Sequence, residues 1–99
     1  MPDPTSLEKA ESLAGHLRVQ VHPAASVGVR PLGTSMVFEI EILSPGGARL
    51  IAFSHEWLDD HTVYELKRQL NRMEVAEALI SKEYLPVLIT NDGVRPYTR

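Results

Sequence analysis

Apolar and polar residues alternate over 36–43, where Phe38, Ile40 and Ile42 are separated by Glu39 and Glu41. This period of two predicts a half-buried strand with one core face and one acidic face. The segment 44–47, Ser-Pro-Gly-Gly, is typical of a tight turn. The following segment, 49–54, is then predicted to return as the hairpin partner. Its consecutive apolar residues favour a strand in the interior of the sheet.

The stretch 62–83 carries the longest helical pattern in the chain. Thr62 and Glu65 have the spacing of a capping box, which marks the start of a helix. Apolar residues then recur at steps of three and four, as expected for a helix with one buried side: Val63, Leu66, Leu70, Met73 and Ile80. We therefore predict a core helix over this stretch.

A second apolar set does not fit one straight helix. Tyr64, Val75 and Leu79 fall on another side, close to Arg68 and Arg72. In one explanation the helix is continuous and this second side meets a partner. In the other, the helix breaks near residue 71 and the apolar residues after the break turn toward the core: Val75, Ala76, Leu79 and Ile80. The scarcity of weak helix formers favours the continuous helix.

The remaining segments predict shorter elements. Thr5 and Glu8 suggest a capped helix that ends at Gly15. Alternation over 17–22 predicts a strand. Further expected elements are an edge strand at 26–30, turns at 31–33 and 91–93, and a strand at 85–90. Residues 1–4 are expected to be a flexible lead and 94–99 a flexible tail.

These elements predict one small α+β domain over residues 1–99. We expect a mostly antiparallel sheet of four or five strands, with the long helix packed on one face and a short N-terminal helix. The last strand follows a helical crossover. It could therefore pair parallel inside the sheet or antiparallel at an edge.

Composition narrows the classes of function. The chain lacks cysteine, which excludes disulfides, thiolate catalysis and cysteine-ligated zinc. A net charge of −3 provides no overall attraction to nucleic acid. No secretory signal and no apolar run of about 20 residues is visible. The expected location is cytoplasmic.

The densest group of ionisable residues lies at 55–61. His55, Glu56, Asp59 and His61 are residue types that bind metal ions and support a metal-dependent enzyme as an alternative. The spacing does not match the zinc protease motif, in which two histidines lie four residues apart. A solvated helix start accounts for the acidic residues better, because carboxylates favour the positive end of the helix dipole. No metal or cofactor is therefore expected.

Basic residues in the middle of the long helix suggest a nucleic-acid-binding regulator as another alternative. Such a surface would use Lys67, Arg68 and Arg72, with Arg95 and Arg99 from the tail. Neighbouring glutamates favour an ordinary mixed-charge surface instead.

The favoured hypothesis is a non-catalytic protein-interaction module that binds a second copy or another protein. No catalytic constellation is recognisable in the sequence, although enzymatic activity stays an open question. The predicted interaction residues are those near the second apolar set: Tyr64, Arg68, Arg72, Val75 and Leu79.

Overall fold

A computed structural model describes residues 5–32 and 36–98 of the chain. It contains helices and strands in mixed order, with the following bounds: α1 Ser6–Val21, β1 Ser26–Leu32, β2 Val37–Ser44, β3 Gly47–Ser54, α2 His55–Asp59, α3 Val63–Arg72, α4 Val75–Ile80, β4 Val87–Thr90 and β5 Gly93–Pro96. The predicted lead at 1–4 lies outside the described residues.

The five strands form one sheet in the order β1-β2-β3-β4-β5. β1, β2 and β3 are antiparallel neighbours, and β4 and β5 form an antiparallel hairpin. β3 and β4 are parallel, because three helices carry the chain back between them. The α+β class and the mostly antiparallel sheet are therefore confirmed. The last predicted strand takes the parallel position, and a fifth strand follows it.

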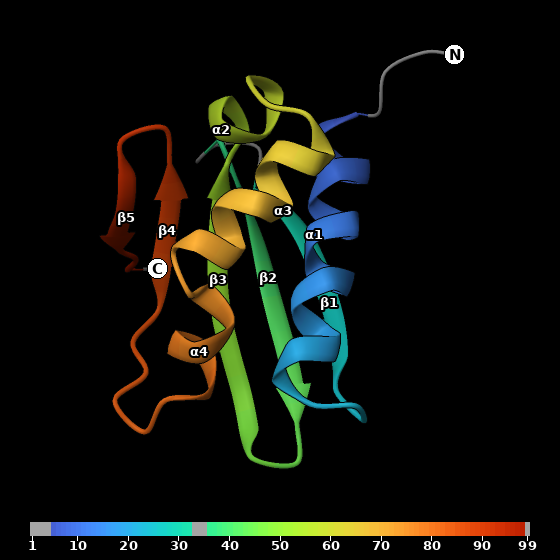
Figure 1. The fold of residues 1–99 in the computed structure, drawn as a ribbon, viewed down its shortest axis with the longest axis vertical. Helices are drawn as coiled ribbons and strands as arrows, with labels where there is room; N and C mark the ends of the chain where they lie inside the picture. The colour runs from blue at the N-terminus through green and yellow to red at the C-terminus, as the bar shows by residue number, and fades with distance from the viewer. Residues whose placement is uncertain (1–4, 33–35, 99) are drawn as a thin grey trace.

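The helices lie on one side of the sheet, with α1, α3 and α4 in front of the strands in Figure 1. Residues facing this layer form the core, because alternate strand positions point to one side. Phe38, Ile40 and Ile42 of β2 are buried there. They meet fully buried helix residues such as Leu13, Leu17, Leu66 and Leu70. The predicted core face of the first hairpin is confirmed.

The N-terminal helix is longer than the sequence analysis predicted. α1 has 16 residues and includes most of the predicted strand at 17–22. Gly15 does not end it. Ala10, Leu13, Ala14 and Leu17 recur at helical spacing and are all buried, so packing against the sheet overrides the local alternation. The predicted strand is wrong.

The predicted helix at 62–83 is two helices, α3 and α4. Both halves of the predicted capping box form at Thr62 and Glu65. The two hydrogen bonds from Thr62 lower the pKa of the Glu65 carboxyl below its usual value. α3 ends at Arg72, and Glu74 then adopts the left-handed conformation with φ 55°. The break near residue 71 is confirmed, and the continuous helix is wrong.

Replacing Glu74 with glycine is expected to stabilise the protein by about 0.5–1 kcal/mol, because glycine adopts positive φ without a steric penalty. Thermal or urea unfolding measures the change. Glu77→Gly is the matched control on α4, where φ is helical and glycine should destabilise by a similar amount. Equal destabilisation by both substitutions would contradict the strain assigned to Glu74.

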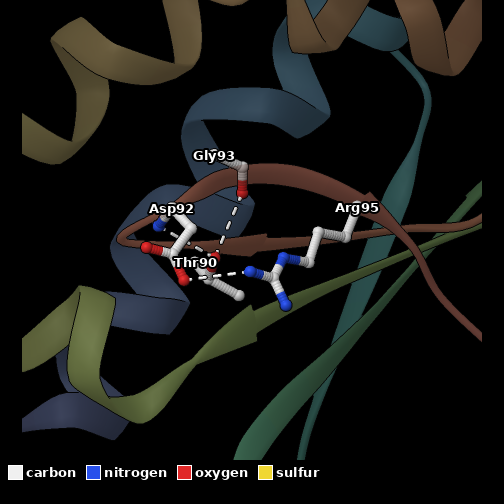
Figure 2. Close-up of polar contacts among 4 residues, drawn as sticks. All are labelled: Thr90, Asp92, Gly93 and Arg95. Carbon is white, nitrogen blue, oxygen red and sulfur yellow. Dashed lines mark hydrogen bonds and ion pairs between the residues drawn. The ribbon is translucent and has the colours of Figure 1, made fainter.

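Residues 94–96, the first part of the predicted flexible tail, belong to β5; residue 99 lies outside the described residues. Thr90 and Gly93 pair across the predicted Asn-Asp-Gly turn, and Gly93 has φ 115°. Figure 2 shows the Thr90 hydroxyl donating to the Gly93 carbonyl and accepting from the Asp92 N–H. The predicted turn is confirmed. The segment 31–32, predicted as part of a turn, continues β1.

The Tyr84 side chain binds the backbone of β3 next to the segment that pairs with β4. On its β3 side, β4 pairs with Ile51–Phe53. Next to this pairing, the Tyr84 hydroxyl donates to the Leu50 carbonyl at 2.6 Å and accepts from the Leu50 N–H. The Arg49 guanidinium lies over the Tyr84 ring and donates to the Leu79 carbonyl of α4. Both backbone groups of Leu50 are thereby satisfied.

Within residues 5–32 and 36–98, no helix combines the length and the apolar character needed to cross a bilayer.

Candidate functional site

The sheet has a second side that no helix of residues 5–32 and 36–98 covers, and we call it the open face. It carries the strand residues that alternate with the core positions. In the register of the strands these residues include Gly28, Arg30, Leu32, Val37, Glu39, Glu41, Leu43, Leu50, Ala52, Leu88 and Arg95. Leu43 is 49% exposed, and Leu32, Leu50 and Leu88 are half-buried. The open face is a candidate site for a macromolecule.

A buried carboxylate lies in the middle of the open face. Glu39 is only 3% exposed and accepts a hydrogen bond from Arg30 Nη2 at 2.7 Å. Its second oxygen accepts from the Tyr97 hydroxyl at 2.5 Å. Tyr97 follows β5, and its N–H donates to the Pro86 carbonyl. These contacts compensate for burying the charge and connect β1, β2 and the end of the chain.

Register explains how this cluster forms. One row of open-face residues crosses all five strands: Arg30, Glu39, Ala52, Leu88 and Arg95. Ala52 is fully buried although no described helix covers it. Its small side chain leaves room between Glu39 and the β4–β5 hairpin. The Tyr97 hydroxyl can therefore reach the carboxylate.

Two hollows flank the Arg30–Glu39 pair. The smaller, of about 300 Å³, is lined by Gly28, Val29, Glu41 and Leu50 in addition to the pair. The larger, of about 670 Å³, lies toward the end of the chain and is lined by Leu32, Val37, Leu88, Pro96, Tyr97 and Thr98 besides the pair. Both are open depressions beside the Arg30–Glu39 pair; the lining of the smaller is mainly polar, and that of the larger is mainly apolar. Such a surface suits contact with another protein chain better than enclosure of a small molecule.

The edges of the sheet are less suited to binding than its face. Edge strand β1 contains Pro31, and edge strand β5 contains Pro96. Proline has no N–H to donate to an added strand, and it is a common device against edge pairing. The face is therefore the better surface for association.

The predicted interaction residues do not form one surface. Tyr64 is 73% exposed on α3, and Arg68 and Arg72 are exposed beside it. Val75 and Leu79 are 3% and 2% exposed, because the break at Glu74 turns α4 toward the core. Val75 and Leu79 are therefore core residues of the described chain and do not share an exposed surface with Tyr64. The role of the α3 residues stays a prediction.

The basic residues of the nucleic-acid alternative are divided between two layers. Lys67, Arg68 and Arg72 lie on α3, whereas Arg95 lies on the open face. Figure 2 shows the Arg95 guanidinium directed at the Asp92 carboxylate, 3.0 Å away. Arg99 lies outside the described residues. The structure does not bring these cations together.

The residues of the metal alternative make separate contacts. His55 stacks on Phe38 with ring centroids 4.4 Å apart, and Asp59 accepts from the Ser6 hydroxyl. His61 Nδ1 is bonded to the Trp57 carbonyl at 2.8 Å, and Glu56 is exposed. Among residues 5–32 and 36–98, no three His, Cys, Asp or Glu side chains are grouped to hold a metal ion.

The Arg30–Glu39–Tyr97 cluster was not predicted from the sequence. Alternation placed Glu39 on the acidic face of its strand, and no partner was predicted for that carboxylate. The signal was the register of β1 against β2, which places Arg30 directly opposite Glu39. Tyr97 had no comparable local signal, because 58 residues separate it from Glu39.

Comparisons of the chain with protein families, with curated proteins and with solved structures found no match.

Proposed function

We propose that this protein is a non-catalytic interaction module that self-associates through the open face. The observation that supports this function best is the single layer of helices among residues 5–32 and 36–98, which leaves the other side of the sheet without a helix over it. On that side Val37, Glu39 and Ala52 are buried, and Leu43 is exposed. That surface presents Leu43, Leu50 and Leu88 around a fixed polar centre. Burial of apolar side chains such as these drives association, and exposed apolar surface can mark interaction sites.

The charges of the open face favour a second copy as the partner. Arg30, Glu39 and Glu41 give the open face charges of both signs, and Arg95 is paired with Asp92. A strongly acidic or strongly basic partner would therefore meet like charges on this face. A second copy offers both signs, as a two-fold interface between identical surfaces requires.

Leu43→Lys tests this function. The substitution adds a charge to an exposed apolar position of the open face, and we expect the dimer dissociation constant to rise by about tenfold or more. Sedimentation equilibrium over a concentration series measures it. Far-UV circular dichroism should stay native, because Leu43 is outside the core. Leu50→Lys is a second variant on the same face.

Tyr64→Lys is the matched control on the helix layer, where the tyrosine is also exposed. It should leave association unchanged. Loss of association in the Tyr64 variant alone would contradict the open face as the interface and would place the interface on α3. A wild-type protein that stays monomeric at every concentration would contradict self-association itself.

A further inference from the structure

We propose that two copies associate with Arg30 of one copy paired to the partner's Glu41, in two equivalent ion pairs across the open face. This inference rests on the proposed function and specifies its contacts. Arg30 is on β1 and Glu41 is on the neighbouring strand β2, and both line the smaller hollow. In a two-fold interface each such pair occurs twice, so the interface contains two Arg30–Glu41 ion pairs.

Arg30 has donors left after its contact within the chain. Its Nη2 donates to Glu39, while the side chain stays 62% exposed. A guanidinium has five N–H donors in a planar fork and can bind two carboxylates at once. The pair with Glu39 also fixes the orientation of the guanidinium, so less side-chain entropy is lost when a second carboxylate binds.

Glu41 is the complementary group. It is exposed, and within residues 5–32 and 36–98 no hydrogen bond or ion pair involves its carboxylate. Register places Glu41 opposite Gly28, and a Cβ added at this glycine would meet nothing within 4 Å. The missing side chain leaves space beside the carboxylate, through which a side chain of another molecule can approach.

Arg30 and Glu41 do not form an ion pair with each other within one chain. Arg30 is directly opposite Glu39, two residues from the position opposite Glu41. It forms its ion pair with Glu39 and none with Glu41. A second copy supplies the missing cation for Glu41 and the second carboxylate for Arg30 in one arrangement. For this reason we place the partner's Arg30 beside Glu41 and the partner's Glu41 beside Arg30.

Glu41→Lys tests the pairing in the full chain. It places like charges opposite Arg30, and we expect the dimer dissociation constant measured by sedimentation equilibrium to rise by at least about tenfold. Since the Glu41 carboxylate forms no hydrogen bond or ion pair among the described residues, the melting temperature at low concentration should stay near the wild-type value. Glu11→Lys, the same change at an exposed position of α1, should leave association unchanged.

Mixing complementary variants is the more specific test. Arg30→Glu and Glu41→Lys should each associate more weakly than the wild type when alone and should form a heterodimer when mixed, because opposite charges then meet again. Circular dichroism must first show that Arg30→Glu is folded, since this variant also loses the pair with Glu39. If Arg30→Glu is unfolded, the dimer dissociation constants of Glu41→Lys and Glu11→Lys test the pairing instead.

The outcomes separate this inference from the proposed function. Loss of association in both Leu43→Lys and Glu41→Lys supports the two together. Loss in Leu43→Lys with wild-type association in Glu41→Lys keeps the open face as the interface and overturns the Arg30–Glu41 pairing. Wild-type association in both variants overturns the interface itself.

Discussion

Replacing Trp57 with alanine is expected to lower the free energy of unfolding by about 3–5 kcal/mol, which is a large part of the total for a domain of this size. Trp57 is the largest fully buried side chain. Its ring packs against Phe53 with centroids 5.3 Å apart, and its Nε1–H donates to Gln69 Oε1 at 2.9 Å. The substitution would remove packing between β3, α2 and α3 at once.

Urea denaturation followed by far-UV circular dichroism measures this loss without needing the tryptophan fluorescence. Trp57→Phe is the control, because it keeps an aromatic ring and removes mainly the bond to Gln69. Its effect should be clearly smaller. A Trp57→Ala variant as stable as the Phe variant would contradict the position of this side chain at the centre of the core.

Lys9→Met is expected to destabilise the protein by about 2–4 kcal/mol, because two backbone carbonyls lose a charged donor. Lys9 is only 9% exposed on α1. Its Nζ donates to the Leu58 carbonyl at 2.9 Å and to the His61 carbonyl at 2.8 Å. Methionine keeps most of the volume and cannot donate. The link between α1 and the junction of α2 with α3 would then be lost.

Lys67→Met is the matched control for this prediction. Lys67 is half-buried on α3, and no hydrogen bond or ion pair of the described residues involves it. The same change there should cost little. Equal melting temperatures for the two variants would show that the Lys9 hydrogen bonds contribute nothing to stability.

Local patterns predicted the parts of the fold whose determinants are close in sequence. The hairpin at 36–54, its turn and the capping box at Thr62 depend on residues within a few positions of one another. The strand at 17–22 failed because Leu17 and Val21 fit both a period of two and a helical period. Only the surface of the sheet, which buries the α1 stripe from Ala10 to Leu17, decides between them.

The break at Glu74 is a second feature that local sequence patterns did not favour. Helix propensity favoured a continuous helix through Asn71, yet Val75 and Leu79 gain more by entering the core. The candidate site was harder to predict, because Glu39 is held by a residue nine positions before it and another 58 positions after it. Sequence reasoning recognised the acidic side of the strand but not its partners.

The hydroxyl of Tyr84 has a consequence for the behaviour of the protein at high concentration. The Leu50 N–H and carbonyl that it binds are the groups an added β-strand would use. While Tyr84 stays in place, this part of β3 cannot act as a template for intermolecular strand pairing. One phenol therefore protects the chain against aggregation at the interior strand that β4 is too short to cover.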